Sequence, residues 1–401
     1  MNYVIIGAGP AAVAAAEKLR VLDSDGHITM IGAQAQQPYS RMAIPYFLTG
    51  KVEESGTYLR RSVDHFQNQR IEVIHGEATA IDPAGHMVMV GDGSTIDYDK
   101  LLIATGAEPI IPPVSGMDDS RVQQCWHLED AERIIELAKP GARAVQVGAG
   151  FIGCIILESW VLRDVSLTVV EMGPRMVPRM LDEKAGNLLK NWCENKGVTV
   201  HAGTTVESIE SSENELNVVL DNGNAYPADV VIVSTGVKPN VGFLQDIDIN
   251  IEQGIEVDEF MQTSVADIYA AGDCAQGLDF STGETAVHAV QPTATEHGRV
   301  AATNMATNNS LPYKGSLNMN ILDTLGLVTS SFGVWEGVAG GDSAEIYNPD
   351  NYQYINLQFK DDVLVGANTV GYHEHLGVLR GLIESRVPLG VWKERLKANP
   401  V

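Results

Sequence analysis

Short apolar runs recur along the chain, and four of them lead into glycine turns. Residues 3–6 and 144–147 precede glycine-rich turns, whereas residues 101–104 and 230–233 run into Thr-Gly pairs. The run over residues 101–104 is apolar throughout, which is typical of a buried strand in a parallel sheet. The order of the runs predicts two similar modules, each starting with a strand, a glycine turn and a helix.

The pattern of hydrophobic and polar residues predicts further strands and helices within these modules, and the pattern changes near residue 313. The expected strands lie at residues 28–31, 71–74, 86–90, 167–170 and 268–271, and the expected helices at residues 11–22, 129–138 and 293–307. After residue 313 the pattern alternates, which predicts strands over residues 354–359 and 363–366 and a last amphipathic helix over 376–385. We therefore predict an α/β fold with two Rossmann-like dinucleotide-binding domains plus a C-terminal α+β domain.

Each glycine turn has the spacing that suits a dinucleotide diphosphate. Gly7 and Gly148 permit a tight turn, and Gly9 and Gly150 let the backbone approach a diphosphate at a helix N-terminus. The third position of each motif, Ala12 or Gly153, allows the helix to pack closely on its strand. Two such motifs in one chain suggest two dinucleotides and electron transfer between them.

Composition narrows the class of partner. The chain has 401 residues and a formal net charge of −25, which argues against nucleic acid or an anionic membrane as the main partner. No apolar run approaches the ~20 residues of a membrane span, so we expect a soluble, cytoplasmic protein. The four cysteines form no C-x-x-C pair or metal-site spacing, and we interpret them as small buried residues. No metal is expected.

Five motifs in order carry a resemblance over nearly the whole chain. The sequence resembles the two-dinucleotide-binding-domain flavoproteins, which include pyridine nucleotide–disulfide reductases, NADH oxidases, ferredoxin and rubredoxin reductases and the flavin part of nitrite reductase. The motifs are Gly7-Ala8-Gly9, Ala104-Thr105-Gly106, Gly148-Ala149-Gly150-Phe151-Ile152-Gly153, Ser234-Thr235-Gly236 and Ile268-Tyr269-Ala270-Ala271-Gly272-Asp273.

The resemblance implies an FAD-binding domain over residues 1–112 and 239–308, an NAD(H)-binding domain over 113–238 and a C-terminal interface domain over 309–401. In such proteins Asp273 would accept a hydrogen bond from a ribitol hydroxyl of FAD. The helix near Ala294 would direct its N-terminus at the flavin pyrimidine. The FAD residues implied are Gly7, Gly9, Pro10, Ala12, Gln34, Arg41, Ala78, Thr105, Gly106, Gly272, Asp273 and Ala294.

The second module would then bind the nicotinamide nucleotide through Gly148, Gly150, Phe151, Ile152, Gly153, Glu171 and Gly236. Glu171 ends a predicted strand about twenty residues after the glycines, where a carboxylate binds the adenosine ribose and repels a 2′-phosphate. This favours NADH over NADPH, although Arg175 and Arg179 offer charges that could accept the phosphate.

The segment over residues 38–50 departs from the family beside the flavin. Met42 stands where NADH oxidases and coenzyme A disulfide reductases have a cysteine, which excludes thiol chemistry through this position. Ferredoxin-reductase relatives have a lysine at the position of Tyr46, paired with a glutamate at the position of Ile155. We therefore expect Met42, Tyr46 and Ile155 near the flavin–nicotinamide contact, with no catalytic residue assigned.

Two groups of histidines have alternative interpretations. His373 and His375 flank Glu374, which could be a metal site but is more typical of a turn or an interface. His288 and His297 adjoin the predicted flavin helix, and they could transfer protons or be packed in the core.

Three hypotheses follow for function. The first is an FAD enzyme that exchanges hydride with NAD(H) and electrons with a ferredoxin- or rubredoxin-like protein, or with iron–sulfur subunits of a larger complex. The second is an NADH oxidase that uses oxygen or a small acceptor. The third is a non-catalytic flavin-binding interaction or sensor protein. The sequence does not specify the oligomeric state.

Overall fold

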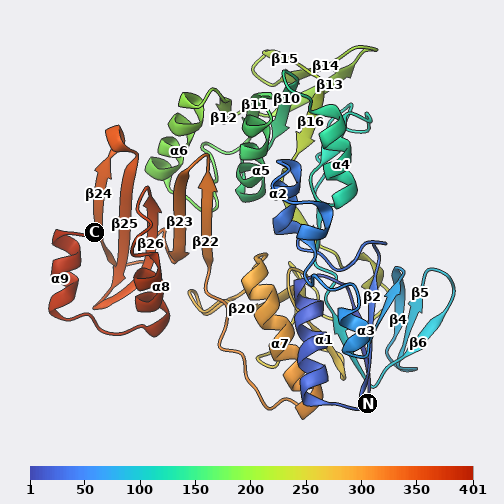
Figure 1. Ribbon diagram of the computed structural model, residues 1–401. Helices are drawn as coiled ribbons and strands as arrows, with labels where there is room; N and C mark the ends of the chain where they lie inside the picture. Colours follow the sequence, from blue (N-terminus) through green and yellow to red (C-terminus); the bar gives the residue numbers. More distant parts are fainter. Residues whose placement is uncertain (401) are drawn as a thin grey trace. The chain divides into compact units, whose positions relative to one another are not determined.

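The structure is a computed structural model that describes residues 1–400 and divides into two compact units (Figure 1). Unit 1 comprises Met1–Ala43, Val52–Glu108 and Val237–Ser316. Unit 2 comprises Ile44–Lys51, Pro109–Gly236 and the described chain from Leu317 onward. Each unit is built around a five-stranded parallel sheet.

The sheet of unit 1 has the order β19-β7-β1-β2-β3, and every neighbouring pair is parallel. Its strands are β19 (Ile268–Ala270), β7 (Lys100–Ile103), β1 (Asn2–Ile6), β2 (His27–Gly32) and β3 (Ile71–His75). Apolar side chains of β1 and β7 are buried, as expected for central strands of a parallel sheet.

Helices α1 (Pro10–Leu22) and α7 (Gln291–Thr307) lie side by side in unit 1 (Figure 1). The two helices approach each other closely at Gly298, where a Cβ atom would lie 2.1 Å from the carbonyl oxygen of Ala11. Only glycine permits this contact, and the small buried alanines of α1 allow the two backbones to pack closely.

Unit 1 also contains smaller elements outside the parallel sheet. One is the short helix α3 (His65–Asn68). An antiparallel sheet contains β4 (Ala78–Asp82), β5 (Met87–Val90) and β6 (Thr95–Asp97). A second small sheet contains β18 (Ile255–Glu256), β20 (Ala275–Leu278) and β21 (Thr285–Val287), and β8 (Ala107–Pro109) pairs with β17 (Val237–Pro239).

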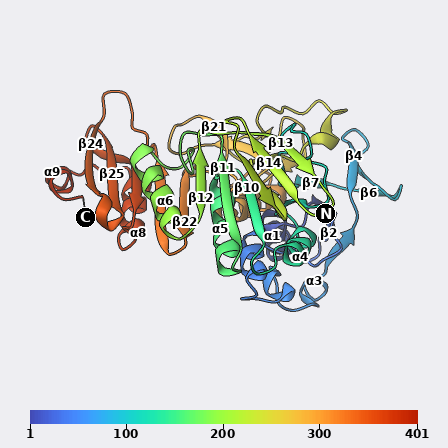
Figure 2. The ribbon, with the colours of Figure 1, turned by 90° about the horizontal axis from the view of Figure 1, so that it is seen from above.

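The parallel sheet of unit 2 has the order β12-β11-β10-β16-β9. Figure 2 shows β10, β11 and β12 side by side with α5 next to them. The strands are β12 (Thr199–Ala202), β11 (Ser166–Glu171), β10 (Arg143–Val147), β16 (Val230–Val233) and β9 (Val122–Gln124). The helices are α2 (Ile44–Leu48), α4 (Leu128–Leu137), α5 (Phe151–Leu162) and α6 (Glu183–Asn195), and a further antiparallel sheet comprises β13 (Val206–Ser211), β14 (Leu216–Leu220) and β15 (Ala225–Ala228).

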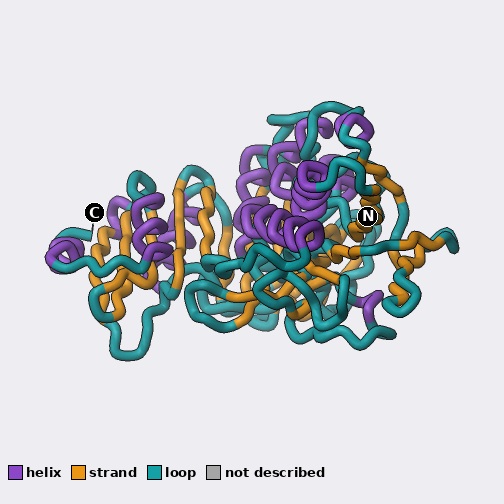
Figure 3. Tube along the Cα trace, turned by 90° about the horizontal axis from the view of Figure 1, so that it is seen from below, coloured by secondary structure: helices purple, strands orange, loops and turns teal. Residues whose placement is uncertain are grey.

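The C-terminal part of unit 2 is a five-stranded antiparallel sheet with two helices, and its orange strands and purple helices can be followed in Figure 3. The order is β22 (Met319–Thr324), β23 (Leu327–Gly333), β26 (Val363–Val370), β25 (Gln353–Lys360) and β24 (Asp342–Asn348). Helix α8 (Leu376–Ser385) packs on β23 and β26, and α6 also contacts these strands.

The expectation that the helix over residues 376–385 is the last one is wrong. A short helix, α9 (Val391–Ala398), follows it and packs against β24. Lys393 and Lys397 form ion pairs of 3.1 and 2.8 Å with Asp342, and Leu396 joins the apolar core. These contacts with a remote strand stabilise a helix too short to form alone.

The predicted fold class is confirmed, because both parallel sheets with their helices are Rossmann-like modules and an α+β part follows them. In residues 1–400, no helix combines the length and the apolar character that crossing a membrane requires.

Candidate dinucleotide-binding sites

The first glycine turn follows β1 directly and has the backbone that the motif requires. Gly7 has φ +122°, and a Cβ atom there would lie 2.2 Å from the carbonyl oxygen of Ala104. Gly9 caps α1, and a Cβ atom on it would meet no atom within 4 Å. Pro10 is the first residue of α1, where its missing N–H costs nothing, and Ala12 is fully buried. The turn is tightly packed on the protein side and open at Gly9.

Other predicted FAD residues lie at the same edge of this sheet. Because β7 is parallel to both β1 and β19, the residues that follow these strands share one edge. Thr105 donates a hydrogen bond of 2.7 Å to the carbonyl oxygen of Asn240. A Cβ atom on Gly272 would lie 3.2 Å from the Cβ of Ala11 and 3.4 Å from that of Ala294, so Gly272 lies between the first turns of α1 and α7.

Asp273 follows Gly272, and its side chain is partly buried. Burial raises its pKa to about 6, and the charge of Arg41 acts in the opposite direction. Among residues 1–400 no group forms a hydrogen bond with this carboxylate. A guanidinium nitrogen of Arg41 also lies 3.9 Å from the Cβ position of Gly106. An unpartnered acceptor beside a basic group fits a ligand that has hydroxyl groups and phosphates.

Gln34 and Ala78 lie on the β2–β3 side of this sheet. The carbonyl oxygen of Gln34 is 3.0 Å from Nδ1 of His75, the last residue of β3, and Ala78 begins β4. Ser40 donates a hydrogen bond of 2.5 Å to the side chain of Gln291, the first residue of α7. The segment that contains Arg41 is therefore tied to the N-terminus of α7. The residues of unit 1 fit FAD.

The second glycine turn follows β10 and repeats this stereochemistry in unit 2. Gly148 has φ +103°, and its Cβ atom would lie 2.4 Å from the carbonyl oxygen of Ser234. A Cβ atom on Gly153 would lie 2.5 Å from the carbonyl oxygen of Gly148, whereas one on Gly150 would meet nothing within 4 Å. Phe151 and Ile152 open α5, and Gly236 has φ +117°. This turn is also closed toward the protein and open toward a diphosphate.

Glu171 ends β11 and is held beside the second glycine turn. Its Oε2 accepts a hydrogen bond of 2.6 Å from the amide of Ala149, and its Oε1 accepts one of 2.6 Å from the amide of Gly173. The side chain is buried. Each carboxylate oxygen has a second lone pair, so the group can also accept from a ribose hydroxyl.

The two arginines after Glu171 have different surroundings. Arg175 donates to the carbonyl oxygens of Leu181 at 2.7 Å and Pro178 at 3.2 Å, which commits its guanidinium to the loop. Arg179 is exposed. The residues of unit 2 fit NAD(H), and Arg175 is less available to a 2′-phosphate than the sequence suggested.

Tyr46 and Ile155 belong to two helices of unit 2 that pack on each other, α2 and α5. Tyr46 is 54% exposed, and Ile155 is partly buried. Met42, in unit 1, is 45% exposed. The surface positions of Met42 and Tyr46 leave both side chains accessible to a ligand.

A Lys–Glu pair that sequence reasoning missed lies near Tyr46 and Ile155. Nζ of Lys51 is 3.6 Å from Oε1 of Glu158, which is one helical turn after Ile155. The signal in the sequence was the spacing of three residues, because positions i and i+3 share a helix face. The pair is partly exposed on the surface of unit 2.

All four cysteines are buried and free. Burial raises the pKa of the Cys125 and Cys193 thiols to about 12 and also raises the pKa of Cys154 and Cys274. The thiolate is the reactive form, so these residues are suited to packing and not to disulfide exchange.

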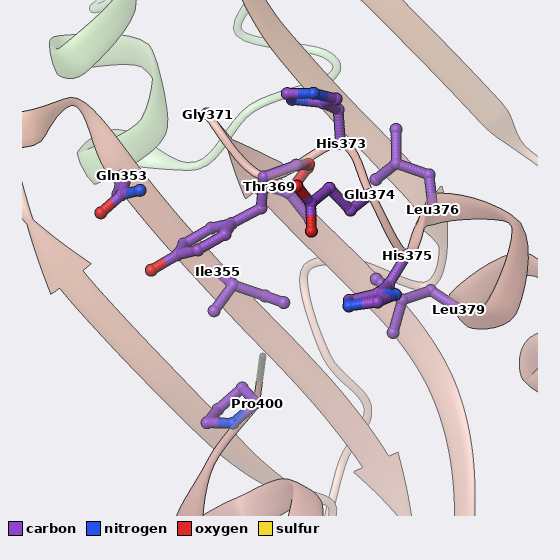
Figure 4. A pocket seen from close by; sticks show the side chains of 11 residues that line it. Gln353, Ile355, Thr369, Gly371, His373, Glu374, His375, Leu376, Leu379 and Pro400 are labelled. Atoms are coloured by element: carbon purple, nitrogen blue, oxygen red, sulfur yellow. The ribbon is translucent and has the colours of Figure 1, made fainter.

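The histidines of the C-terminal domain line a pocket of about 330 Å³ (Figure 4). Its lining includes His373, Glu374 and His375 together with Ile355, Leu376, Leu379 and Pro400. Within residues 1–400, no group of three or more His, Cys, Asp or Glu side chains is placed to hold a metal ion.

His297 lies in the interior of unit 1, where its Nε2 is 3.0 Å from Oγ of Ser316. Burial, with a smaller effect of His288, lowers the pKa of His297 to about 3. It is therefore neutral over the physiological pH range, which favours the packed interpretation over proton transfer.

Comparison with known proteins identifies the family. Residues 1–293 match the model of the family described as pyridine nucleotide-disulphide oxidoreductase. The chain is 31% identical over 403 residues to the NADH-dependent phenylglyoxylate dehydrogenase subunit epsilon of Aromatoleum evansii, covering 100% of this chain and 95% of the relative. It is 33% identical over 315 residues to an NADH oxidase of Methanocaldococcus jannaschii, covering 76% and 70% of the two chains.

A solved structure agrees over almost the whole fold. The chain superposes on putidaredoxin reductase from its covalent complex with putidaredoxin, with a TM-score of 0.90, 25% identity, and coverage of 96% of this chain and 94% of that one. The resemblance drawn from the five motifs is confirmed. The chain belongs to the pyridine nucleotide–disulphide oxidoreductase family and is an FAD-binding oxidoreductase that works with NAD(H) or NADP(H).

Proposed function

We propose that this chain exchanges hydride with NADH and electrons with iron–sulfur centres on a partner protein or partner subunits. The observation that carries the proposal is the pair of glycine turns, each closed toward the protein and open at Gly9 or Gly150. A bound FAD supplies two-electron exchange with a nicotinamide and single-electron exchange with another redox protein. With all four thiols buried, the chain offers no cysteine to continue the reaction.

The residues of unit 1 would hold FAD by three kinds of contact. The N-terminus of α1 would face the diphosphate, and Arg41 would add a positive charge beside it. Asp273 would accept from a ribitol hydroxyl, which would replace the solvation that burial has removed. The first turn of α7, near Ala294, would place its partial positive charge beside the flavin and favour negative charge there.

The preference for NADH rests on Glu171. Both of its oxygens are fixed by backbone amides, so the carboxylate cannot turn away from a ribose 2′-substituent. A hydroxyl donates to it, whereas a phosphate meets a negative charge at close range. The guanidinium of Arg175 donates to loop carbonyls and does not compensate.

The proposed electron partner follows from the absence of reactive thiols together with the relatives. One relative is named as a subunit of a dehydrogenase, and putidaredoxin reductase is a partner of putidaredoxin in its solved complex. We propose the subunit arrangement for this chain, because the alignment with the named subunit spans 100% of this chain and 95% of the subunit.

Anaerobic reduction tests the proposal. The purified FAD-loaded protein is titrated with NADH and, separately, with NADPH while flavin absorbance is followed. We expect rapid bleaching with NADH, and reoxidation on addition of an iron–sulfur protein purified from the same source. Absence of bleaching by NADH over minutes would contradict the proposal and support a non-catalytic flavin-binding role.

The likeness to an NADH oxidase favours a second candidate, with oxygen as the acceptor. The two candidates are distinguished with the same preparation, by measuring NADH turnover after air is admitted without any partner protein. Turnover in air as fast as turnover with the iron–sulfur protein would favour the oxidase.

A further inference from the structure

The loop that follows Glu171 connects the nucleotide site to the C-terminal sheet. It spans residues 172–182, between β11 and α6. At its nucleotide end, the amide of Val177 donates a hydrogen bond of 2.8 Å to the carbonyl oxygen of Ala149, the middle residue of the second glycine turn. Ala149 in turn donates to Glu171. This end of the loop is therefore part of the cradle around the adenosine half of the nucleotide.

The loop is braced internally. Arg175 lies near its start, and its guanidinium donates to the carbonyl oxygens of Pro178 and Leu181 near its end. Val177 is buried with φ +48°, a conformation that costs a β-branched residue free energy and persists only where neighbours impose it. We expect the loop to move as one piece, so a displacement at one end reaches the other.

The far end of the loop is held by the C-terminal sheet. The side-chain amide of Asn368, on β26, donates to the carbonyl oxygen of Met180 at 2.8 Å, and its Oδ1 accepts from the amide of Asp182 at 3.4 Å. Asp182 caps α6 through Ala185 and accepts a hydrogen bond of 2.5 Å from the hydroxyl of Tyr354 on β25. Asn368 is 0% exposed, and Met180 is also buried.

We propose that Asn368 is a positioning residue for NAD(H), acting through the 172–182 loop on Ala149 and Glu171; this rests on the proposed function of unit 2. Without Asn368 the buried carbonyl of Met180 has no partner, and the loop relieves this by shifting toward water. Such a shift pulls Val177 from Ala149 and Glu171 from the ribose. Tyr354, which fixes Asp182, supports the same arrangement.

The decisive variant is Asn368→Leu, which keeps the branching of the side chain but removes its hydrogen bonds. Binding is measured on the FAD-loaded protein with two ligands, NADH and reduced nicotinamide mononucleotide, which lacks the adenosine half. We expect the Kd for NADH to rise about tenfold and the Kd for the mononucleotide to change less than about twofold. A merely structural defect would affect both ligands alike.

Ser331→Ala is the matched control. Ser331 lies directly across the β23–β26 ladder from Asn368 and is equally buried, and its hydroxyl has no hydrogen-bond partner among the described residues. We expect its Kd for NADH to equal that of the wild type.

Tyr354→Phe keeps the proposal testable if Asn368→Leu fails to fold. It removes only the hydroxyl that reaches Asp182, and we expect a rise of about two- to fivefold in the Kd for NADH. An unchanged Kd in a folded Asn368→Leu or Tyr354→Phe protein would overturn the proposal, as would an equal loss with the mononucleotide. If the wild type itself fails to bind NADH, the proposed function has failed instead.

Discussion

The amide of Ala149 and Oε2 of Glu171 are joined by a hydrogen bond of 2.6 Å, so the turn and the end of β11 form one surface. Gln at position 171 would place an NH₂ group against one of two amide donors. For Glu171→Gln we expect the Kd for NADH to rise about 10- to 100-fold. The affinity for NADPH should increase, because the site loses the negative charge that repels the 2′-phosphate. Titration with both nucleotides gives the ratio, and an unchanged preference for NADH would exclude this role of Glu171.

The open sides of Gly9 and Gly150 separate nucleotide binding from folding. Both residues have negative φ, and an alanine Cβ would meet no protein atom within 4 Å. For Gly150→Ala we expect a Tm within about 2 °C of the wild type and at least about a tenfold weaker affinity for NADH, because the methyl group occupies the place of the diphosphate. Gly9→Ala should lose FAD in the same way.

Gly148→Ala is the contrasting variant, since its Cβ atom would lie 2.4 Å from the carbonyl oxygen of Ser234. We expect it to lower the thermal stability of unit 2 even without ligand. Equal Tm values for the Gly148 and Gly150 variants would contradict the prediction that only Gly148 is packed against the protein. Differential scanning calorimetry of the FAD-free proteins makes the comparison.

Asp273 gives the FAD-free protein a pH dependence of known sign. Its pKa is about 6 in the folded chain against an ordinary value of 3.8, so the folded state holds the proton over a pH range where the unfolded state has released it. Stability is therefore lost as pH rises from about 4 to about 6. For Asp273→Asn we expect higher stability without FAD at pH 7.5, on the order of 2 kcal/mol, and weaker FAD binding.

Measurement at two pH values checks this expectation. At pH 3.5 the wild type and the Asn variant should have similar free energies of unfolding, and the gap should open by pH 7.5. A gap independent of pH would mean that the carboxylate is not the cause.

Two polar contacts near the ends of α2 and α5 should differ strongly in how much they contribute to the free energy of unfolding. Arg163 donates to the carbonyl oxygens of Leu48, Ile135 and Ala138, which joins α2 and α4 to the end of α5. Lys51 and Glu158 are a partly exposed ion pair at 3.6 Å. For Arg163→Met we expect a loss of about 2–3 kcal/mol of stability, and for Lys51→Met less than about 1 kcal/mol. Urea unfolding of both variants measures the two losses of stability. A larger loss for Lys51→Met than for Arg163→Met would contradict this prediction.

The strand–glycine–helix modules were predictable from sequence because their signals are local. The apolar runs that end at Gly7 and Gly148 became β1 and β10, and the helix expected over residues 376–385 is α8. A glycine turn also restricts its own backbone, so the motif and the positive φ occur together. The assignments of individual residues to FAD and NAD(H), and the division into three domains, stay predictions.

Contacts between remote residues could not be predicted in this way. Asn368 and Met180 are 188 residues apart, and nothing in either local sequence indicates the partner. The Lys51–Glu158 pair was missed because the expected pair was sought at the positions of Tyr46 and Ile155 only. Helix α9 was missed because its stability depends on Asp342 of β24.

The close contact of α1 and α7 at Gly298 has a consequence for the cell. It brings two helix N-termini, each with a partial positive charge, to the same place beside Gly272. The like partial charges of these ends oppose each other, so we expect the anionic diphosphate of a bound FAD to stabilise unit 1 as well as to hold the cofactor. Cells that are short of riboflavin should therefore accumulate less of this protein, because its vacant form unfolds more often and is exposed to proteases.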